Sequence, residues 1–178
     1  MKIAKIIGLI SGLIIFSLVT GLLIEKEVGK INWKNDVAIV IPTGVVNNKE
    51  TVEVIRVIDG DTIEIAGGQK VRYIGVDTPE TVDPKRPVGC FGKKASAKNK
   101  ELVEGKTVEL EKDVSNTDKY GRLLRYVWVG DRMINEELIT EGYAKLDTVP
   151  PDVKYSQLLI KAEKEARISD IGLWSKCP

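Results

Sequence analysis

Two glycine-containing turns between short runs of β-branched residues constrain this fold more than any other feature. The runs cover residues 51–58, 62–66 and 70–76, with Asp59-Gly60 and Gly67-Gly68 between them. An Asp-Gly pair between two β-rich runs is a strong hairpin signal. The pattern therefore predicts three antiparallel strands in a meander.

The remainder of the chain alternates strand and helix patterns. Two further strands are predicted at 107–111 and 124–129. Three helices are predicted at 91–104, at 135–140 and from beyond Asp152 to about 169. Asn135 is interpreted as the N-cap of its helix. Five short strands with inserted helices predict an α+β fold, a five-stranded OB-type β-barrel with three α-helices. The order of elements alone does not exclude another α+β fold.

The N-terminus has a different composition. Residues 6–24 are nineteen uncharged residues that follow Lys2 and Lys5. As a helix they would just span a hydrocarbon core of about 30 Å. The segment is interpreted as one hydrophobic helix, a signal anchor over 1–24, with a cleaved signal peptide as the alternative. Residues 25–49 then form a tether and 50–178 the main domain. Both alternatives predict an extracytoplasmic domain, with membrane contact in the first.

Composition limits the ligands that this chain can bind. The 178 residues carry a net charge of only +1, so nucleic-acid binding must come from a local patch. The chain has no histidine, the commonest ligand of zinc and copper. A bound metal would therefore have oxygen ligands, which favours calcium, magnesium or manganese. No motif indicates an obligate protein partner.

The chain contains two cysteines, Cys90 and Cys177. An even number of cysteines in an exported chain favours a disulfide, which would tie the C-terminal tail to the middle of the domain. The alternative is two unpaired thiols.

Two aspartates are predicted to meet at one end of the sheet. Asp61 begins a strand directly after a hairpin turn, and Asp77 ends the next strand. Two carboxylates at one sheet end repel each other unless a cation lies between them. Asp59, which precedes Gly60, is interpreted as an ordinary turn residue.

Three more charged residues flank these acids in the sequence. Arg72 lies within a strand between two apolar residues, so its side chain points away from the core. Arg122 follows a Tyr-Gly turn. Two guanidiniums directed at one point can hold a phosphate and offset its developing charge. Glu80 is then a candidate to orient or deprotonate a water molecule.

A basic segment follows these motifs. Between residues 85 and 100 there are six basic residues and no acid, namely Lys85, Arg86, Lys93, Lys94, Lys98 and Lys100. Such a segment can bind a polyanion backbone, although a solvated helix face is the alternative for each lysine.

Together these motifs resemble the staphylococcal nuclease, or thermonuclease, family. The resemblance rests on residues 57–62, 72–80 and 118–122, which occur in the family's order and spacing, and it extends from about Thr51 to Trp174. It implies a five-stranded barrel with three helices. It also implies calcium-dependent hydrolysis of DNA and RNA, preferably single-stranded, to products with 3′-phosphates.

The resemblance also implies roles for individual residues. Asp61 and Asp77 would be carboxylate ligands of Ca²⁺, and Thr78 would add its backbone carbonyl. Arg72, Glu80 and Arg122 would be catalytic, with the arginines on the scissile phosphate and Glu80 on the attacking water. Lys119 and Tyr120 would bind the neighbouring nucleotide.

The sequence departs from the family pattern at residues 147–151. This segment reads Asp-Thr-Val-Pro-Pro where relatives have tyrosines that contact nucleotide. The first hypothesis is a nuclease without sequence specificity. The alternative is a non-catalytic nucleic-acid-binding barrel at the cell surface.

Overall fold

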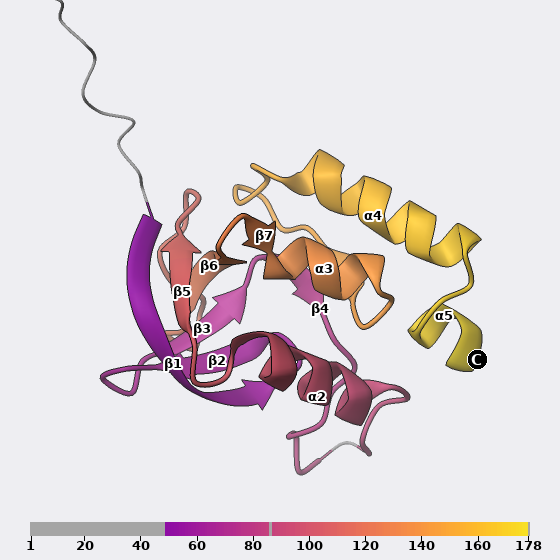
Figure 1. Cartoon of the computed structure of the whole chain (residues 1–178), viewed down its shortest axis with the longest axis horizontal. Coiled ribbons are helices and arrows are strands. Elements are labelled where there is room, and N and C mark those ends of the chain that lie inside the picture. The colour runs from indigo at the N-terminus through magenta and orange to yellow at the C-terminus, as the bar shows by residue number, and fades with distance from the viewer. Residues whose placement is uncertain (1–48, 86, 178) are drawn as a thin grey trace, which may run out of the picture. The chain divides into compact units, whose positions relative to one another are not determined.

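The computed structural model describes residues 49–85 and 87–177, and the fold below refers to these residues (Figure 1). The meander consists of β1 (Lys49–Asp59), β2 (Thr62–Ile65) and β3 (Lys70–Tyr73), which pair antiparallel. β5 (Thr107–Glu111) pairs with β1, and β6 (Leu123–Val129) pairs with β5. The strand order is therefore β3-β2-β1-β5-β6.

A parallel pairing closes this sheet into a barrel. Val71, Arg72 and Tyr73 of β3 lie beside residues 123–125 of β6, so the last strand returns to the edge of the meander. Closure removes both free sheet edges. The predicted five-stranded barrel in an α+β fold is confirmed.

The predicted strand over 70–76 is in fact two strands. β3 ends at Tyr73, and β4 (Gly75–Asp77) leaves the barrel to pair with β8 (Lys145–Asp147). The break lies at Gly75, whose φ is +76°, and a side chain there would collide with Leu159. Only glycine adopts this conformation without strain. The break directs Asp77 away from the barrel wall.

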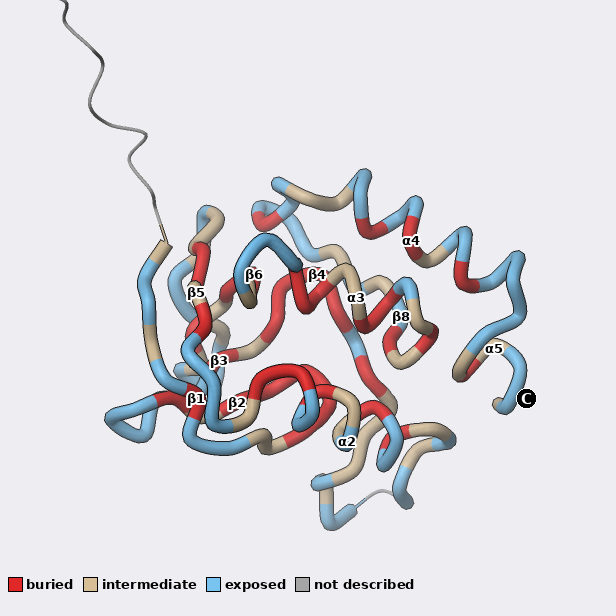
Figure 2. Tube along the Cα trace, viewed as in Figure 1, coloured by how far each residue is buried: buried red, intermediate tan, exposed pale blue. Residues whose placement is uncertain are grey.

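Three longer helices lie outside the barrel wall, as predicted. They are α2 (Gly92–Val103), α3 (Ile134–Thr140) and α4 (Ser156–Ile168). The short β7 (Arg132–Met133) pairs with β6, and a short α5 (Leu173–Lys176) ends the described chain. α3 packs against α4 and β6, and α2 against β1 and α3 (Figure 1). Buried residues are frequent along the strands and α3, and recur along α4 (Figure 2).

Apolar side chains of the strands and helices form one continuous core. Its largest fully buried aliphatic and aromatic members are Ile63, Tyr73, Leu110, Tyr126, Ile134, Leu138, Ile139 and Leu159. β2, β3 and β5 each contribute alternate residues to this core, as half-buried strands do. Removal of this apolar surface from water is the main favourable term in folding.

Asn135 is not the N-cap that its sequence position suggests. The helix already begins at Ile134, and Asn135 is fully buried in its first turn. Its amide nitrogen donates to the Ile74 carbonyl oxygen at 2.8 Å, and its amide oxygen accepts from the Val127 N–H at 2.8 Å. These bonds satisfy one backbone group at the break between β3 and β4 and one in β6, and leaving either unpaired would be costly.

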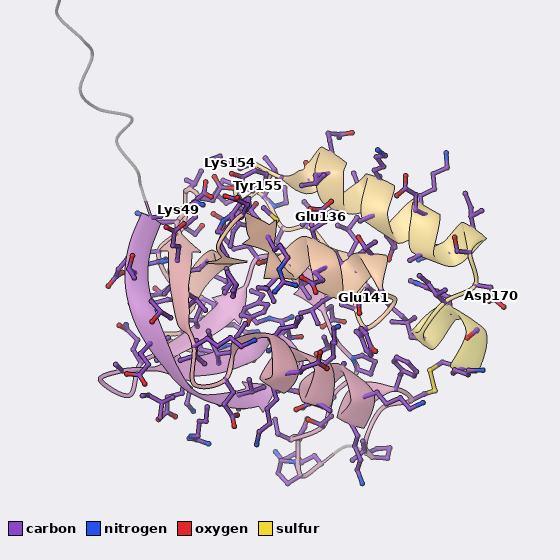
Figure 3. All side chains as sticks on the ribbon, viewed as in Figure 1. Lys49, Glu136, Glu141, Lys154, Tyr155 and Asp170 are labelled. Carbon is purple, nitrogen blue, oxygen red and sulfur yellow. A yellow bond between two sulfur atoms is a disulfide. The ribbon has the colours of Figure 1, made fainter. Side chains whose placement is uncertain are left out.

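Cys90 and Cys177 form a disulfide in the structure, with their Cα atoms 5.8 Å apart (Figure 3). Cys90 immediately precedes the Phe91 N-cap of α2, and Cys177 immediately follows α5. The bridge closes a loop with a sequence separation of 87 residues. It thus joins the C-terminal segment to the start of the first long helix.

The N-terminal predictions fall on residues outside the described part of the chain. These are the hydrophobic helix over 1–24 and nearly all of the tether over 25–49. Lys49, the last residue assigned to the tether, is the first residue of β1. Among the residues that the structure describes, no helix is both long and apolar enough to cross a bilayer.

Removing the disulfide should destabilise the domain. For the Cys90→Ser/Cys177→Ser variant we expect the free energy of unfolding to fall by about 2–5 kcal/mol, since the unfolded chain regains loop freedom. Urea denaturation followed by tryptophan fluorescence measures this. A reductant should lower the stability of the wild type similarly and leave the variant unchanged. Equal stability of oxidised wild type and variant would contradict the expectation.

Candidate active site

The predicted site residues gather around one cavity of about 260 Å³ at an end of the barrel. It is lined by the predicted residues Asp61, Arg72, Asp77, Thr78, Glu80 and Arg122, together with Ile58, Asp59, Thr62, Lys70 and Val82. They come from the β1–β2 turn, from β3 and β4, from the loop after β4 and from the turn before β6. The meander, β4 and the loop after it supply the lining residues between 58 and 82, and barrel closure adds Arg122 from the turn before β6.

Asp61 is the most enclosed acid of this cavity, with 5% of its surface exposed. One carboxylate oxygen, Oδ2, accepts hydrogen bonds from the backbone N–H and the hydroxyl of Thr78, both at 2.8 Å. The other, Oδ1, accepts a bond from the Thr62 hydroxyl at 3.0 Å and pairs with Nη1 of Arg72. These partners hold the carboxylate in one orientation and satisfy a buried charge.

Gly60 allows Thr78 to approach Asp61 this closely. A Cβ atom at position 60 would lie 2.6 Å from the Thr78 hydroxyl oxygen and 2.8 Å from its Cβ. Such contacts are too short for any side chain. Gly60 therefore serves the geometry of the cavity as well as the turn.

Arg72 connects the two predicted acidic ligands. Its Nη1 pairs with Asp61, and its Nη2 donates to Oδ1 of Asp77 at 3.3 Å. Burial lowers the pKa of Arg72 from its ordinary value, and the nearby Asp77 opposes that change. The positive charge of Arg122 also lowers the pKa of Arg72, so the two guanidiniums are close enough to repel each other. An anion between them would relieve this repulsion.

Arg122 is oriented by its own turn. Its Nε donates to Oδ2 of Asp118 at 2.7 Å, and its backbone N–H donates to Oδ1 of the same residue at 3.0 Å. Asp118 also accepts from the Tyr120 N–H at 2.9 Å. The pKa of Asp118 lies below its ordinary value because these bonds outweigh the desolvation that raises it. The turn thus fixes the guanidinium, whose Nη1 reaches the Thr62 hydroxyl at 3.4 Å.

The oxygen donors around Arg72 suit a hard cation. Asp61 and Asp77 both contact one guanidinium, so the two carboxylates lie close enough to share a single cationic group. The Asp77 side chain is 58% exposed, which leaves it accessible. Within residues 49–85 and 87–177, no three acidic, cysteine or histidine side chains cluster as a metal site. The set inferred from the resemblance has two carboxylates and a backbone carbonyl, a donor chemistry that calcium accepts.

Glu80 is held by the loop that follows it. Its Oε1 accepts hydrogen bonds from the backbone N–H groups of Thr81, Val82 and Asp83, at 3.0, 2.8 and 3.1 Å. The bond from Val82 is the main cause that lowers the pKa of Glu80. A carboxylate stabilised in this way stays ionised and is a weak proton acceptor. Orienting a water molecule suits it better than removing a proton.

Asp59 is a residue of this cavity that the sequence interpretation missed. It is 7% exposed, and its Oδ1 accepts from the Thr81 hydroxyl at 2.6 Å and from the Gly60 N–H at 2.8 Å. Burial raises its pKa, and the negative charge of Glu80 raises it further. Asp-Gly turn chemistry accounts for its position in the sequence, so no pattern distinguished it.

Lys119 and Tyr120 line a second cavity, of about 560 Å³, which shares Arg72 and Arg122 with the first. Tyr120 is 72% exposed, and the Lys119 ammonium lies 5.0 Å from the centre of its ring. Asp147 and Val149, from the segment that departs from the family pattern, also line this cavity. The structure therefore places both predicted nucleotide-contact residues beside the arginine pair.

Fold and site together define a closed OB-type barrel with paired carboxylates and paired guanidiniums at one end. A family model described as "Staphylococcal nuclease homologue" matches residues 70–176. The thermonuclease of Staphylococcus intermedius is 47% identical over 130 residues, which is 71% of this chain and 77% of that protein. Endonuclease YncB of Bacillus subtilis (strain 168) is 44% identical over 137 residues, which is 73% of this chain and 65% of that protein. The chain belongs to the staphylococcal nuclease family.

Replacing Asp59 should change how stability depends on pH. The pKa of Asp59 is higher in the folded protein than in the unfolded chain. Above the folded pKa, where Asp59 is ionised in both states, it therefore lowers the free energy of unfolding. Well below the unfolded pKa, where it is protonated in both states, this loss is absent. We therefore expect Asp59→Asn to gain stability relative to wild type at pH 7, and to gain less at pH 3. Urea unfolding in chelator measures both, with the exposed Asp131→Asn as control. A difference independent of pH would contradict this.

Proposed function

We propose that this protein is a calcium-dependent endonuclease that hydrolyses DNA and RNA and leaves 3′-phosphate ends. The observation that carries the proposal is the meeting of Asp61, Asp77, Arg72, Arg122 and Glu80 around one cavity. Relatives named thermonuclease and endonuclease support the nuclease class. The calcium requirement and the 3′-phosphate products follow from the family resemblance of the three motifs.

The cation would be held by oxygen ligands from two neighbouring segments. Asp61, Asp77 and the backbone carbonyl of Thr78 would hold Ca²⁺, and the close approach of both carboxylates to Arg72 supports this set. When bound, Ca²⁺ neutralises charge on the phosphate and helps to orient the water.

The two arginines bind the scissile phosphate in this proposal. As the phosphorus becomes five-coordinate, negative charge accumulates on its oxygens, and guanidiniums already in place stabilise it. Asp118 holds Arg122, and the two aspartates hold Arg72, so little reorganisation is needed. The two guanidiniums also repel each other, and binding of an anionic phosphate between them would offset that repulsion.

Glu80 orients the attacking water. One of its carboxylate oxygens, Oε1, accepts hydrogen bonds from three backbone N–H groups, which leaves Oε2 as the second oxygen of the carboxylate. That second oxygen can accept a proton of water in the cavity. Because the pKa of Glu80 is lowered, the role that fits is positioning, with the proton passing on to solvent.

The second cavity receives the nucleotide next to the scissile linkage. Tyr120 can stack on a base, and Lys119 lies beside it to meet the adjoining phosphate. Stacking on Tyr120 requires a base that is free of its partner, so single-stranded substrate is preferred. Stacking is tolerant of base identity, which agrees with cleavage without sequence specificity.

The proposed location is outside the cytoplasm. The uncharged run over 6–24 is the basis of this proposal, as an anchor or as a cleaved signal. The Cys90–Cys177 disulfide supports it, because disulfides persist in oxidising compartments.

A non-catalytic nucleic-acid-binding barrel is the second candidate. The carboxylate of Asp147 lines the cavity proposed for nucleotide and would repel a phosphate there. This reading predicts retention of single-stranded DNA without cleavage in calcium.

Calcium should control turnover. Denatured DNA and RNA incubated with the protein should be degraded in Ca²⁺ and remain intact in chelator, because the acids alone repel the phosphate. Gel electrophoresis measures this, and removal of 3′-phosphates by a phosphatase identifies the ends. Degradation unchanged by chelation would contradict the calcium mechanism, and binding without degradation would favour the second candidate.

Glu80→Gln should lower kcat by about 10²–10⁴-fold, because the charge that orients water is lost. The glutamine oxygen can still accept the three backbone bonds, so the thermal unfolding midpoint should change little. Glu101→Gln, at an exposed glutamate on α2, is the matched control and should keep wild-type kcat. Activity of Glu80→Gln within threefold of wild type would show that Glu80 does not act on the water.

A further inference from the structure

A groove lined by lysines leads away from the proposed active site. Its first part, a cavity of about 250 Å³, is lined by Asp77, Pro79, Cys90, Lys145, Leu173 and Cys177. Its second part, of about 350 Å³, is lined by Val88, Gly89, Cys90, Phe91, Lys93, Lys94 and Lys176. Asp77 also lines the active-site cavity, and Cys90 lines both parts. The three cavities therefore adjoin one another through these shared residues, and we call the two outer parts the lysine groove.

The positive charge of this groove is not neutralised within the described part of the chain. Lys93, Lys94, Lys145 and Lys176 line it, and none of them has an ion-pair partner among the residues described. Asp77, at the active-site end, is the one carboxylate in either lining. Four ammonium groups on one continuous surface produce a local field that favours a polyanion.

Neighbouring lysines on the same helix behave differently. Lys98 pairs with Glu141 at 2.9 Å, and Lys100 pairs with Glu104 at 3.0 Å (Figure 3 labels Glu141). These two lysines therefore have acidic partners within the chain. The lysines of α2 that lie outside the groove thus have acidic partners, whereas the groove lysines do not among the described residues.

Two groove lysines lie where they oppose helix stability. Lys93 and Lys94 are in the first turn of α2, which contains no acidic residue. The amino end of a helix carries a partial positive charge, so cations there are unfavourable. Unfavourable charge placements of this kind occur at functional sites. An anion bound to Lys93 and Lys94 would offset their repulsion from the amino end of the helix.

The disulfide holds the groove together. Lys176 precedes Cys177, and Lys93 and Lys94 follow Cys90 by a few residues, so the bridge brings the C-terminal lysine to the helix lysines. The Phe91 ring lies beneath the Lys94 ammonium at 5.0 Å and beside Tyr143 at 5.4 Å. At the other end, Lys145 is the register partner of Asp77 in the β4–β8 ladder.

We propose that the lysine groove binds the sugar-phosphate backbone of the substrate strand beyond the cleaved linkage. This proposal rests on the proposed nuclease function and adds a binding site for a longer strand. Asp77 lines both the active-site cavity and the groove, so a strand with one phosphate between Arg72 and Arg122 can extend into the groove. Backbone recognition is independent of sequence, because each lysine contacts a phosphate and not a base edge.

The test compares a short substrate with a long one. The short substrate is a 5′-phosphorylated thymidine dinucleotide. The long substrates are thymidine strands with one ordinary phosphodiester and nuclease-resistant phosphorothioates elsewhere, extended by ten nucleotides to either the 5′ or the 3′ side. For Lys93→Ala/Lys94→Ala/Lys176→Ala we expect kcat/KM to fall about tenfold or more on at least one extended strand. On the dinucleotide it should stay within twofold of wild type.

A binding measurement separates this proposal from the nuclease proposal. Fluorescence anisotropy of a labelled thymidine 12-mer in chelator gives Kd without cleavage. Three lost contacts should reduce the slope of log Kd against log salt by about 2. If the wild-type protein cleaves no substrate, the proposed nuclease function is refuted. The anisotropy measurement still tests whether the groove binds the strand. Unchanged Kd and slope in the triple variant refute the groove, even if cleavage is normal.

The matched control removes equal charge elsewhere. Lys100→Ala/Lys161→Ala/Lys164→Ala changes exposed lysines on α2 and α4 outside the groove lining. It should keep wild-type kcat/KM and salt slope on every strand. Equal losses in both triple variants would mean that net charge alone acts, and would overturn the proposal. Loss of binding to phosphatidylglycerol vesicles, with strand binding intact, would assign the groove to membranes and also overturn it.

Discussion

The guanidinium of Arg72 between Asp61 and Asp77 is the interaction on which the rest of the site depends. It joins the start of β2, the middle of β3 and the end of β4 at one point. Removing such charges from water is expensive, so a buried ion pair is weak evidence for stability. Its value here lies in geometry, because it holds together the two acids and the arginine on which the proposed cation and phosphate binding rests.

The acids reach that point because the barrel is interrupted at one residue. Gly75 ends β3 and directs β4 outward to β8, and the buried amide of Asn135 satisfies the backbone at the break. A continuous strand over 70–76 would keep Asp77 in the barrel wall. Residues that take no part in the proposed chemistry, Gly75 and Asn135, thus determine where Asp77 lies.

A second support lies further from the site. The Gly89 N–H donates to the Glu80 carbonyl oxygen at 2.8 Å, and the disulfide begins at the next residue. The loop that presents Glu80 is consequently closed at its far end by a covalent bridge to the C-terminal segment. Both cysteines of the bridge also line the lysine groove, so the loop of Glu80 and the groove share one structural element.

The strands were predictable because turn chemistry is local. Asp59-Gly60 and Gly67-Gly68 impose reversals whatever the surroundings, and alternation then assigns the faces. The roles of Asp59 and Asn135 were not predictable in this way. Each has a common local explanation, as a turn residue and as an N-cap, and burial in the folded barrel overrides it. The break at Gly75 was missed for a similar reason, since β4 leaves the barrel to pair with the distant strand β8.

By itself the sequence determined the five barrel strands, the three longer helices and the residue types of the site. These follow from periodicity, turn residues and motif spacing, all of which act over a few positions. Only the tertiary structure decided that Arg72 bridges two aspartates, that Asp59 is buried beside Glu80, and that lysines from two distant segments line one groove. Those facts depend on the β3–β6 closure and on the disulfide, which bring together residues that no local pattern relates.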